Sequence, residues 1–170
     1  MYIGFYNNIK QFNKNRMLYD PSSRIGEDLM YPFVYLGQRL KEMEHKVATI
    51  DTDDIKKLDA IIFIDFPTLK NKYFKRLIKN NHQNLYLIII ESPIIKPDNF
   101  DKENHKYFKK IFTWSDDLVD NHSNPSGQAK KYFKINYSYK IPTRFNFTNK
   151  KEKLCTLISS NKLIKHSAEL

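Results

Sequence analysis

The sequence predicts an α/β domain in which a Rossmann-like parallel sheet is flanked by helices. Short apolar runs alternate with amphipathic stretches along the chain, which is the pattern of a parallel sheet with helical crossovers. Two runs, residues 60–64 and 85–90, are continuous and rich in β-branched residues, as expected of strands that are buried on both faces. Neither Gly-x-Gly-x-x-Gly nor Gly-x-x-x-x-Gly-Lys-Ser/Thr occurs, so the two familiar phosphate-binding loops are absent.

The composition is that of a globular protein. The 170 residues allow one domain with a core and the start of a second, and 41% apolar residues argue against wholesale disorder. The single cysteine, Cys155, excludes an internal disulfide and fits a reducing compartment. No apolar run approaches the roughly 18–20 residues of a membrane span, and the first residues do not resemble a signal peptide. These features predict a soluble, cytoplasmic protein.

The chain is strongly basic, with 29 basic and 19 acidic side chains and a formal net charge of +10. This surplus favours anionic partners and permits peripheral contact with an acidic membrane surface. The positive charges are spread along the chain, however, with no block of five or more. We therefore expect a solvated basic surface and no nucleic-acid groove.

The first strand, residues 2–6, precedes a polar loop at 7–24 that is longer than most such connections. Long loops in compact domains are often functional, and Arg16 and Arg24 are candidates to face an anionic ligand; a surface loop without a ligand is the alternative. Apolar residues at helical spacing predict a helix over 29–43, with Pro32 in its first turn.

A strand over 47–50 is followed by Asp51, Asp53 and Asp54. An Asp-x-Asp pattern can hold a divalent metal and a nucleotide diphosphate, as in one large class of glycosyltransferases. Acids between a strand and a following helix are also typical of a turn and an N-cap. Because no second ligand cluster supports a metal, and the five histidines lack metal-ligand spacing, we expect a turn and no metal site.

The strands at 60–64 and 85–90 both end in an acid that is followed by a proline two residues later. The acids are Asp65 and Glu91. The carboxyl ends of parallel strands share one edge of the sheet, where ligands bind in open α/β folds. If the two strands are neighbours, we expect both acids at one rim; the alternative is two similar β-to-α corners. A helix over 69–79, basic on its solvent face, connects them.

The second half continues the alternation. We expect a helix over 100–110, a strand over 111–114, a polar loop over 122–128 and a strand over 133–139. A charged connector at 150–153 leads to a further strand at 154–158, and residues from Lys162 onward resemble the approach to a helix.

Three short motifs occur in order along the chain. They are Glu91-Ser92-Pro93, Phe112-Thr113-Trp114-Ser115 and Leu157-Ile158-Ser159-Ser160-Asn161. In this the chain resembles the α-1,3-fucosyltransferase family, glycosyltransferase family 10. Members of that family have a Glu-Ser-Pro after a buried strand, then a Phe-x-Trp-Thr stretch, then a strand ending in Ser-Asn that opens a second domain. The resemblance covers essentially the whole chain.

The resemblance implies a GT-B arrangement, in which two Rossmann-like domains face a cleft. Residues 1–149 would be the acceptor-side domain, and residues 150–170 the start of a truncated donor-binding domain that holds GDP-fucose.

The resemblance also implies roles for single residues. Glu91 matches the general base that deprotonates the acceptor hydroxyl in an inverting transfer. Ser92, Trp114 and Ser115 are acceptor-binding candidates, although a lone tryptophan at a strand end is more often part of the core. Asp65, as the acid beside Glu91, is our own addition to this group. Ser160 and Asn161 are the donor-binding candidates.

The chain departs from the family after two of these motifs. Ser115-Asp116-Asp117-Leu118 stands where the family usually has Thr-x-Ser-Tyr-Arg, and no arginine follows Asn161 to engage a diphosphate. The later Tyr-x-x-Glu-Lys motif is missing, so we expect this chain alone to transfer no sugar and a GDP-sugar donor to bind only to a longer chain. No cofactor is expected.

Two alternative functions remain. One is a non-catalytic Rossmann-like module that binds an anionic ligand through a basic surface. The other is a metal-dependent transferase of the GT-A type that uses Asp51 and Asp53.

Overall fold

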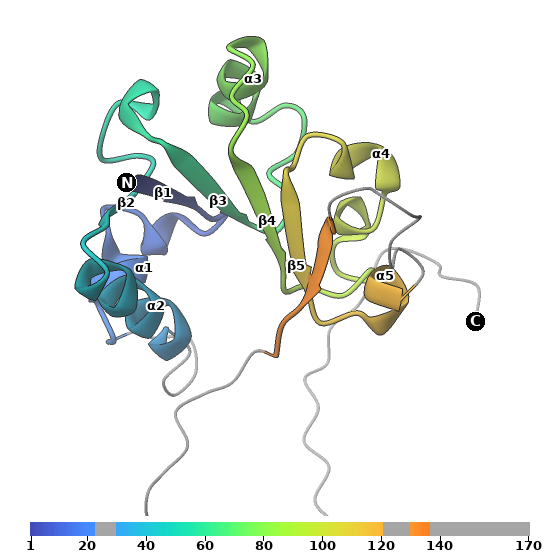
Figure 1. Ribbon diagram of the computed structural model, residues 1–170, viewed down its shortest axis with the longest axis horizontal. Coiled ribbons are helices and arrows are strands. Elements are labelled where there is room, and N and C mark those ends of the chain that lie inside the picture. Colours follow the sequence, from blue (N-terminus) through green and yellow to red (C-terminus); the bar gives the residue numbers. More distant parts are fainter. Residues whose placement is uncertain (23–29, 121–129, 137–170) are drawn as a thin grey trace, which may run out of the picture.

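A computed structural model describes residues 1–22, 30–120 and 130–136, and these form one sheet with helices on both faces (Figure 1). Six strands lie in the order β2-β1-β3-β4-β5-β6, and every neighbouring pair is parallel. The predicted Rossmann-like parallel sheet is therefore confirmed. The strands are β1 (Tyr2–Tyr6), β2 (Lys46–Thr49), β3 (Ala60–Ile64), β4 (Leu85–Ile89), β5 (Lys110–Thr113) and β6 (Tyr132–Lys134).

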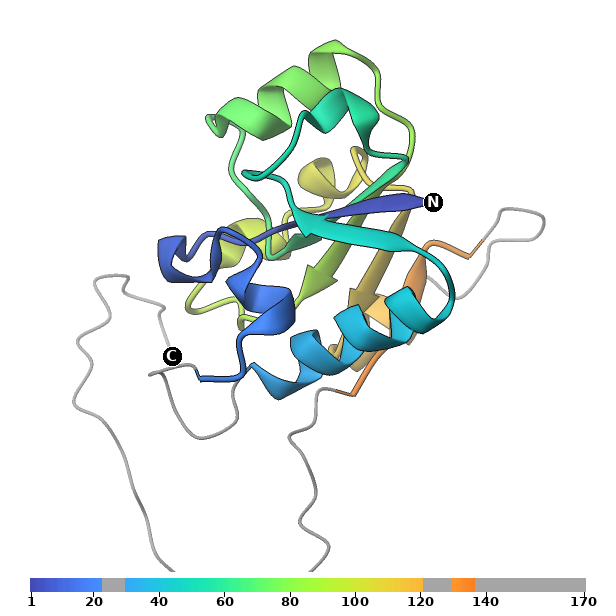
Figure 2. The ribbon, with the colours of Figure 1, turned by 90° about the vertical axis from the view of Figure 1, so that its left-hand side faces the viewer.

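Helices α1 and α2 lie on one face of the sheet and α3 lies on the other (Figure 2). Short 3-10 turns occupy several of the connections. The helices are α1 (Arg16–Tyr19), α2 (Tyr31–Glu42), α3 (Lys72–Lys79), α4 (Lys102–His105) and α5 (Asp116–Asp120), and the 3-10 turns are η1 (Lys10–Phe12), η2 (Ile55–Lys57) and η3 (Pro97–Asn99).

Each face of the sheet has its own hydrophobic core. On the α3 face the core is aromatic: Phe63 packs edge-to-face on Phe74 and Phe108, with ring centroids 5.3 Å and 5.9 Å away. On the α2 face, Phe5 and Met17 are almost fully buried beneath the helices. Alternate residues of β3 serve the two cores, which is the period of a strand buried on both sides.

Two predicted helices have the wrong limits. The side chain of Asn71 accepts hydrogen bonds from the amides of Tyr73 and Phe74, so α3 starts at Lys72, and Leu69 is 50% exposed outside it. The helix expected over 100–110 is only α4, since Asp101 caps its start and Lys110 already belongs to β5. Helix α5 was not predicted.

The α2 face is covered unevenly among the described residues. Helix α2 packs near β1 and β2, whereas Tyr86, Ile88, Phe112 and Phe133 on the same face of β4, β5 and β6 are only half-buried. Phe112 and Phe133 lie side by side with ring centroids 5.6 Å apart. This part of the sheet is apolar but lacks a described covering helix.

Several predictions fall outside the described residues. They concern Arg24, the loop at 122–128, residues 137–139 of the strand expected at 133–139, and everything from residue 140 onward, including Cys155, Ser160, Asn161 and the domain start at 150–170. The strand itself is shorter than predicted, because β6 ends at Lys134 and the described residues 135 and 136 lie beyond it. Within the part of the chain that the structure describes, no helix has the length and apolarity needed to cross a membrane.

Candidate functional site

The strand order reverses direction between β1 and β3. From β1 the chain passes to β2 on one side, and from β3 onward the strands are added on the other side. In open α/β sheets such a switch point opens a crevice outside the carboxyl ends of the strands, where ligands bind. Asn7 follows β1, Asp65 follows β3 and Glu91 comes two residues after β4. Because β3 and β4 are neighbours, the prediction that the two acids share one rim is confirmed.

A cavity of about 310 Å³ lies at this switch point and is lined by Asn7, Asp65, Glu91 and Lys96 together with apolar side chains. Glu91 is exposed, so its carboxylate is accessible from solvent. The apolar part of the lining includes Phe12, Met17, Met30 and Phe33. Such a cavity, mostly apolar with a few polar groups, is typical of a small-molecule site.

Asp65 holds the backbone that carries Glu91. Its Oδ1 accepts hydrogen bonds from the amides of Ile90 (2.9 Å) and Glu91 (3.1 Å) and from Nδ2 of Asn99 (2.7 Å). Asp65 is buried and has a φ of 59°, a left-handed conformation that Asp and Asn adopt more readily than other non-glycine residues. The bonds join Asp65 to the backbone of Glu91, which gives this acid a positioning role.

A buried polar chain extends from Asp65 to the edge of the sheet. The carbonyl of Asn99 lies 2.7 Å from Nε2 of His105, and Nδ1 of His105 lies 2.9 Å from the Tyr132 hydroxyl on β6. Nε2 must donate to the carbonyl, so Nδ1 of a neutral imidazole accepts from the hydroxyl. Burial raises the pKa of Tyr132. Sequence reasoning missed this network. The only hint of it in the local sequence was Asn99, which comes two residues after Pro97.

Trp114, from the second of the three motifs, follows β5 and lies at the same edge of the sheet. Its indole Nε1 donates to the Ile90 carbonyl at 3.0 Å, and its ring meets Phe100 edge-on. At 41% exposed, Trp114 is not a core residue, so the core interpretation was wrong. With Ile90 and Ile135 it lines a second cavity of about 340 Å³, so Glu91 directly follows a residue that borders two cavities.

The two serines differ in accessibility. Ser92 is half-buried, and its carbonyl accepts the amides of Ile95 and Lys96, closing the turn after Glu91. Ser115 is buried, its amide donates to Oγ1 of Thr113, and its carbonyl accepts from Val119 at the start of α5. The backbone of Ser115 therefore serves local structure.

The three acids after β2, Asp51, Asp53 and Asp54, form hydrogen bonds with different partners. Asp51 accepts the amide of Lys14, whereas Asp53 accepts the hydroxyl of Tyr2 (2.8 Å). Asp54 caps η2, which confirms the predicted turn and N-cap. Among the residues at 1–22, 30–120 and 130–136, no group of three or more His, Cys, Asp or Glu side chains could hold a metal.

A third cavity at the carboxyl edge, of about 370 Å³, is basic. It is lined by Lys10, Lys14 and Arg16, with Gln11, Asn13 and Asp51 completing the wall. Arg16, predicted as a candidate to face an anionic ligand, therefore lines a cavity.

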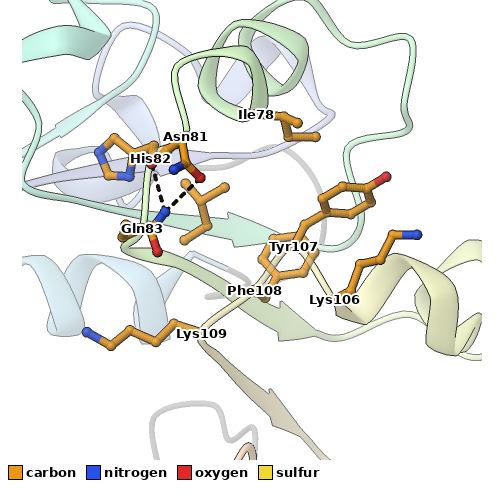
Figure 3. A pocket seen from close by; sticks show the side chains of 9 residues that line it. Ile78, Asn81, His82, Gln83, Lys106, Tyr107, Phe108 and Lys109 are labelled. Carbon is orange, nitrogen blue, oxygen red and sulfur yellow. Dashed lines mark hydrogen bonds between the residues drawn. The ribbon is translucent and has the colours of Figure 1, made fainter.

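A further cavity, of about 410 Å³, lies between α3 and α4 near the starts of β4 and β5 (Figure 3). Its polar side chains already have partners. Lys109 donates to Asn84, Gln83 donates to Asn81, and Lys106 pairs with Glu103. Figure 3 shows the ammonium groups of Lys106 and Lys109 on opposite sides of the cavity. They do not converge on one ligand, so we do not regard this cavity as the functional site.

Comparisons of the chain with models of protein families, with curated proteins and with solved structures find no match.

Proposed function

We propose that this chain is the acceptor-binding portion of a fucosyltransferase-like glycosyltransferase, with Glu91 as its general base. One observation carries the proposal. An exposed carboxylate stands at the switch point of a parallel sheet, in the lining of a cavity, on a backbone that a buried aspartate holds. The order of the short motifs around Glu91 supplies the choice of reaction.

The proposed reaction uses the carboxylate in one step. Glu91 takes the proton of an acceptor hydroxyl while the hydroxyl oxygen bonds to the anomeric carbon of fucose. The bond from that carbon to the diphosphate breaks, and GDP leaves with the electron pair. General-base assistance of this kind contributes about 10²–10⁴-fold to a rate.

The other candidate residues take supporting roles in this proposal. The exposed ring of Trp114 offers an apolar face to a sugar ring, and the Ser92 hydroxyl lies in the turn that carries Glu91. Asp65 acts through the Glu91 backbone, and Ser115 through the start of α5. Ser160 and Asn161 remain the donor-side candidates within a GT-B arrangement.

The test of the proposal is Glu91→Gln in a longer chain that carries a complete donor domain. We expect fucose transfer from GDP-fucose to fall by about 10²–10⁴-fold, with little change in the KM for the acceptor, because the amide keeps the shape but cannot take the proton. The 170-residue chain itself is expected to bind acceptor without transferring sugar.

The matched control is Glu103→Gln, because Glu103 is an exposed glutamate on α4 whose side chain, within the described part of the chain, pairs only with Lys106. Transfer should be unchanged in this variant, and circular dichroism should show both variants folded. Undiminished turnover in Glu91→Gln would remove the catalytic role.

A second candidate function has an observation of its own. The cavity lined by Lys10, Lys14 and Arg16 at the same edge favours a non-catalytic module that binds an anionic ligand. Ligand binding that depends on these cations, together with undiminished turnover in Glu91→Gln, would favour this candidate.

A further inference from the structure

We infer that the cavity lined by Lys10, Lys14 and Arg16 is a binding site for a phosphate monoester, such as the phosphate of a phosphorylated sugar. This site is separate from the Glu91 cavity, and the inference does not depend on sugar transfer. The two cavities are nevertheless close, because both are lined by residues in and around the single turn η1. Ile9 and Phe12 line the Glu91 cavity, whereas Lys10 and Gln11 line the basic one.

The charges in this cavity match a phosphate monoester. Among the described residues, Lys10, Lys14 and Arg16 form no salt bridge within 4.0 Å. Arg16 is close enough to Asp20 to contribute to lowering the pKa of that exposed carboxyl, behind its hydrogen bonds to Ser22. Three cations and the single carboxylate of Asp51 leave a surplus of two positive charges in the lining. A phosphate monoester carries about −1.5 to −2 charges at neutral pH, whereas a carboxylate would leave one cation unmatched.

The polar groups fit the rest of a phosphorylated sugar. Guanidinium can bind two phosphate oxygens at once, and ammonium groups act as point charges. Gln11 and Asn13 line the cavity, and their side-chain amides can donate hydrogen bonds to sugar hydroxyls and accept them. Asp51 uses Oδ2 for the amide of Lys14; among the described residues Oδ1 accepts no hydrogen bond, so it can accept one from a sugar hydroxyl.

The loop that carries the cations is held in place before any ligand arrives. Lys14 and Asn15 both have left-handed backbones, with φ of 57° and 62°. The amide of Asn15 donates to Oγ1 of Thr49 (2.9 Å), and Oδ1 of Asn15 accepts the amide of Thr49 (2.7 Å). Such conformations cost free energy and cluster at ligand sites, where a fixed loop lowers the entropy lost on binding.

The experiment measures binding to the 170-residue chain by isothermal titration calorimetry. The probes are a hexose phosphate, inorganic phosphate, the uncharged hexose, and vesicles with and without a lipid that bears a phosphate monoester. We expect the hexose phosphate to bind and the hexose alone to fail. Lys10→Gln with Lys14→Gln should weaken binding by about tenfold or more, because two charge-assisted contacts are lost.

The matched control is Lys75→Gln with Lys79→Gln. It removes the same charge from exposed positions on α3. An equal loss in this control would mean that diffuse surface charge binds the probe, which overturns the inference, as would failure of every phosphate probe. If only the phosphate-bearing vesicles bind, and Lys10 and Lys14 are needed, the phosphate site stands and its source is a membrane surface. Glu91→Gln should leave all of these affinities unchanged, so the outcome is independent of the proposed transfer.

Discussion

At the scale of single residues, Asp65 shows how one side chain sets the geometry of the candidate site. Its Oδ1 collects three donors, two of them the consecutive amides of Ile90 and Glu91. These amides lie just beyond the last β4 residue, where the sheet no longer supplies a partner. A carboxylate that accepts several backbone amides is among the stronger hydrogen-bond arrangements in proteins.

We therefore predict a graded response at position 65. Asp65→Ala should lower the free energy of unfolding by about 3 kcal/mol or more, because buried donors lose their acceptor and alanine tolerates the left-handed backbone poorly. Asp65→Asn keeps an acceptor oxygen and accepts a positive φ, so its loss should be nearer 1 kcal/mol. Urea denaturation of both variants measures the difference. Equal losses would show that the carboxylate does not hold this turn.

At the scale of elements, a contact between Tyr2 and Asp53 ties the start of β1 to the loop after β2. Burial, the hydrogen bond to Asp53 and the charge of Asp53 together raise the pKa of Tyr2 to about 12. The same hydrogen bond contributes most to lowering the pKa of Asp53, with further contributions from the Asp54 amide and from Lys57 and Lys46. The contact thus gives Asp53 a structural role.

The pH dependence of this contact follows from the raised pKa of Tyr2 and the lowered pKa of Asp53. A raised tyrosine pKa means that its stabilisation is fully present below the ordinary value of 10.0 and is lost as the pH rises through about 12. A lowered aspartate pKa means that its stabilisation is present above 3.8 and is lost as the pH falls further.

We predict that the ultraviolet titration difference between wild type and Tyr2→Phe has its midpoint near pH 12. In Asp53→Asn, Tyr2 should titrate at lower pH because the charge that opposes its ionisation is gone. A wild-type midpoint near 10.0, the ordinary tyrosine value, would contradict the contact.

The elements also show which features a single sequence can predict. Apolar runs predicted the five strands from β1 to β5 within one residue or so, because burial on two faces leaves a continuous signal. The limits of helices were predicted less well. The Asn71 cap decides where α3 starts, and the surrounding sequence does not show which of several polar residues will be the cap. The Asp65–Asn99 bond joins residues 34 positions apart, and nothing local announces it.

At the scale of the whole molecule, the sheet divides the described structure into two unequal layers. The α3 face is closed by aromatic packing, whereas the α2 face is covered near β1 and β2 and half-exposed along β4, β5 and β6. Parallel sheets normally have both faces covered, so the contribution of each face to stability should be measured. Adjacent residues of β5 report on the two faces: Ile111 is fully buried on the α3 face, and Phe112 is half-buried on the other.

We predict that Ile111→Ala lowers the free energy of unfolding by about 2–5 kcal/mol, the usual cost of truncating a fully buried isoleucine. Phe112→Ala removes more atoms but should cost only about 1 kcal/mol, since its ring retains solvent contact in the folded state. Chemical denaturation of the two variants against wild type makes the comparison within one strand. A loss at Phe112 as large as that at Ile111 would show that the half-exposed strip of β4, β5 and β6 contributes to stability as a buried core does.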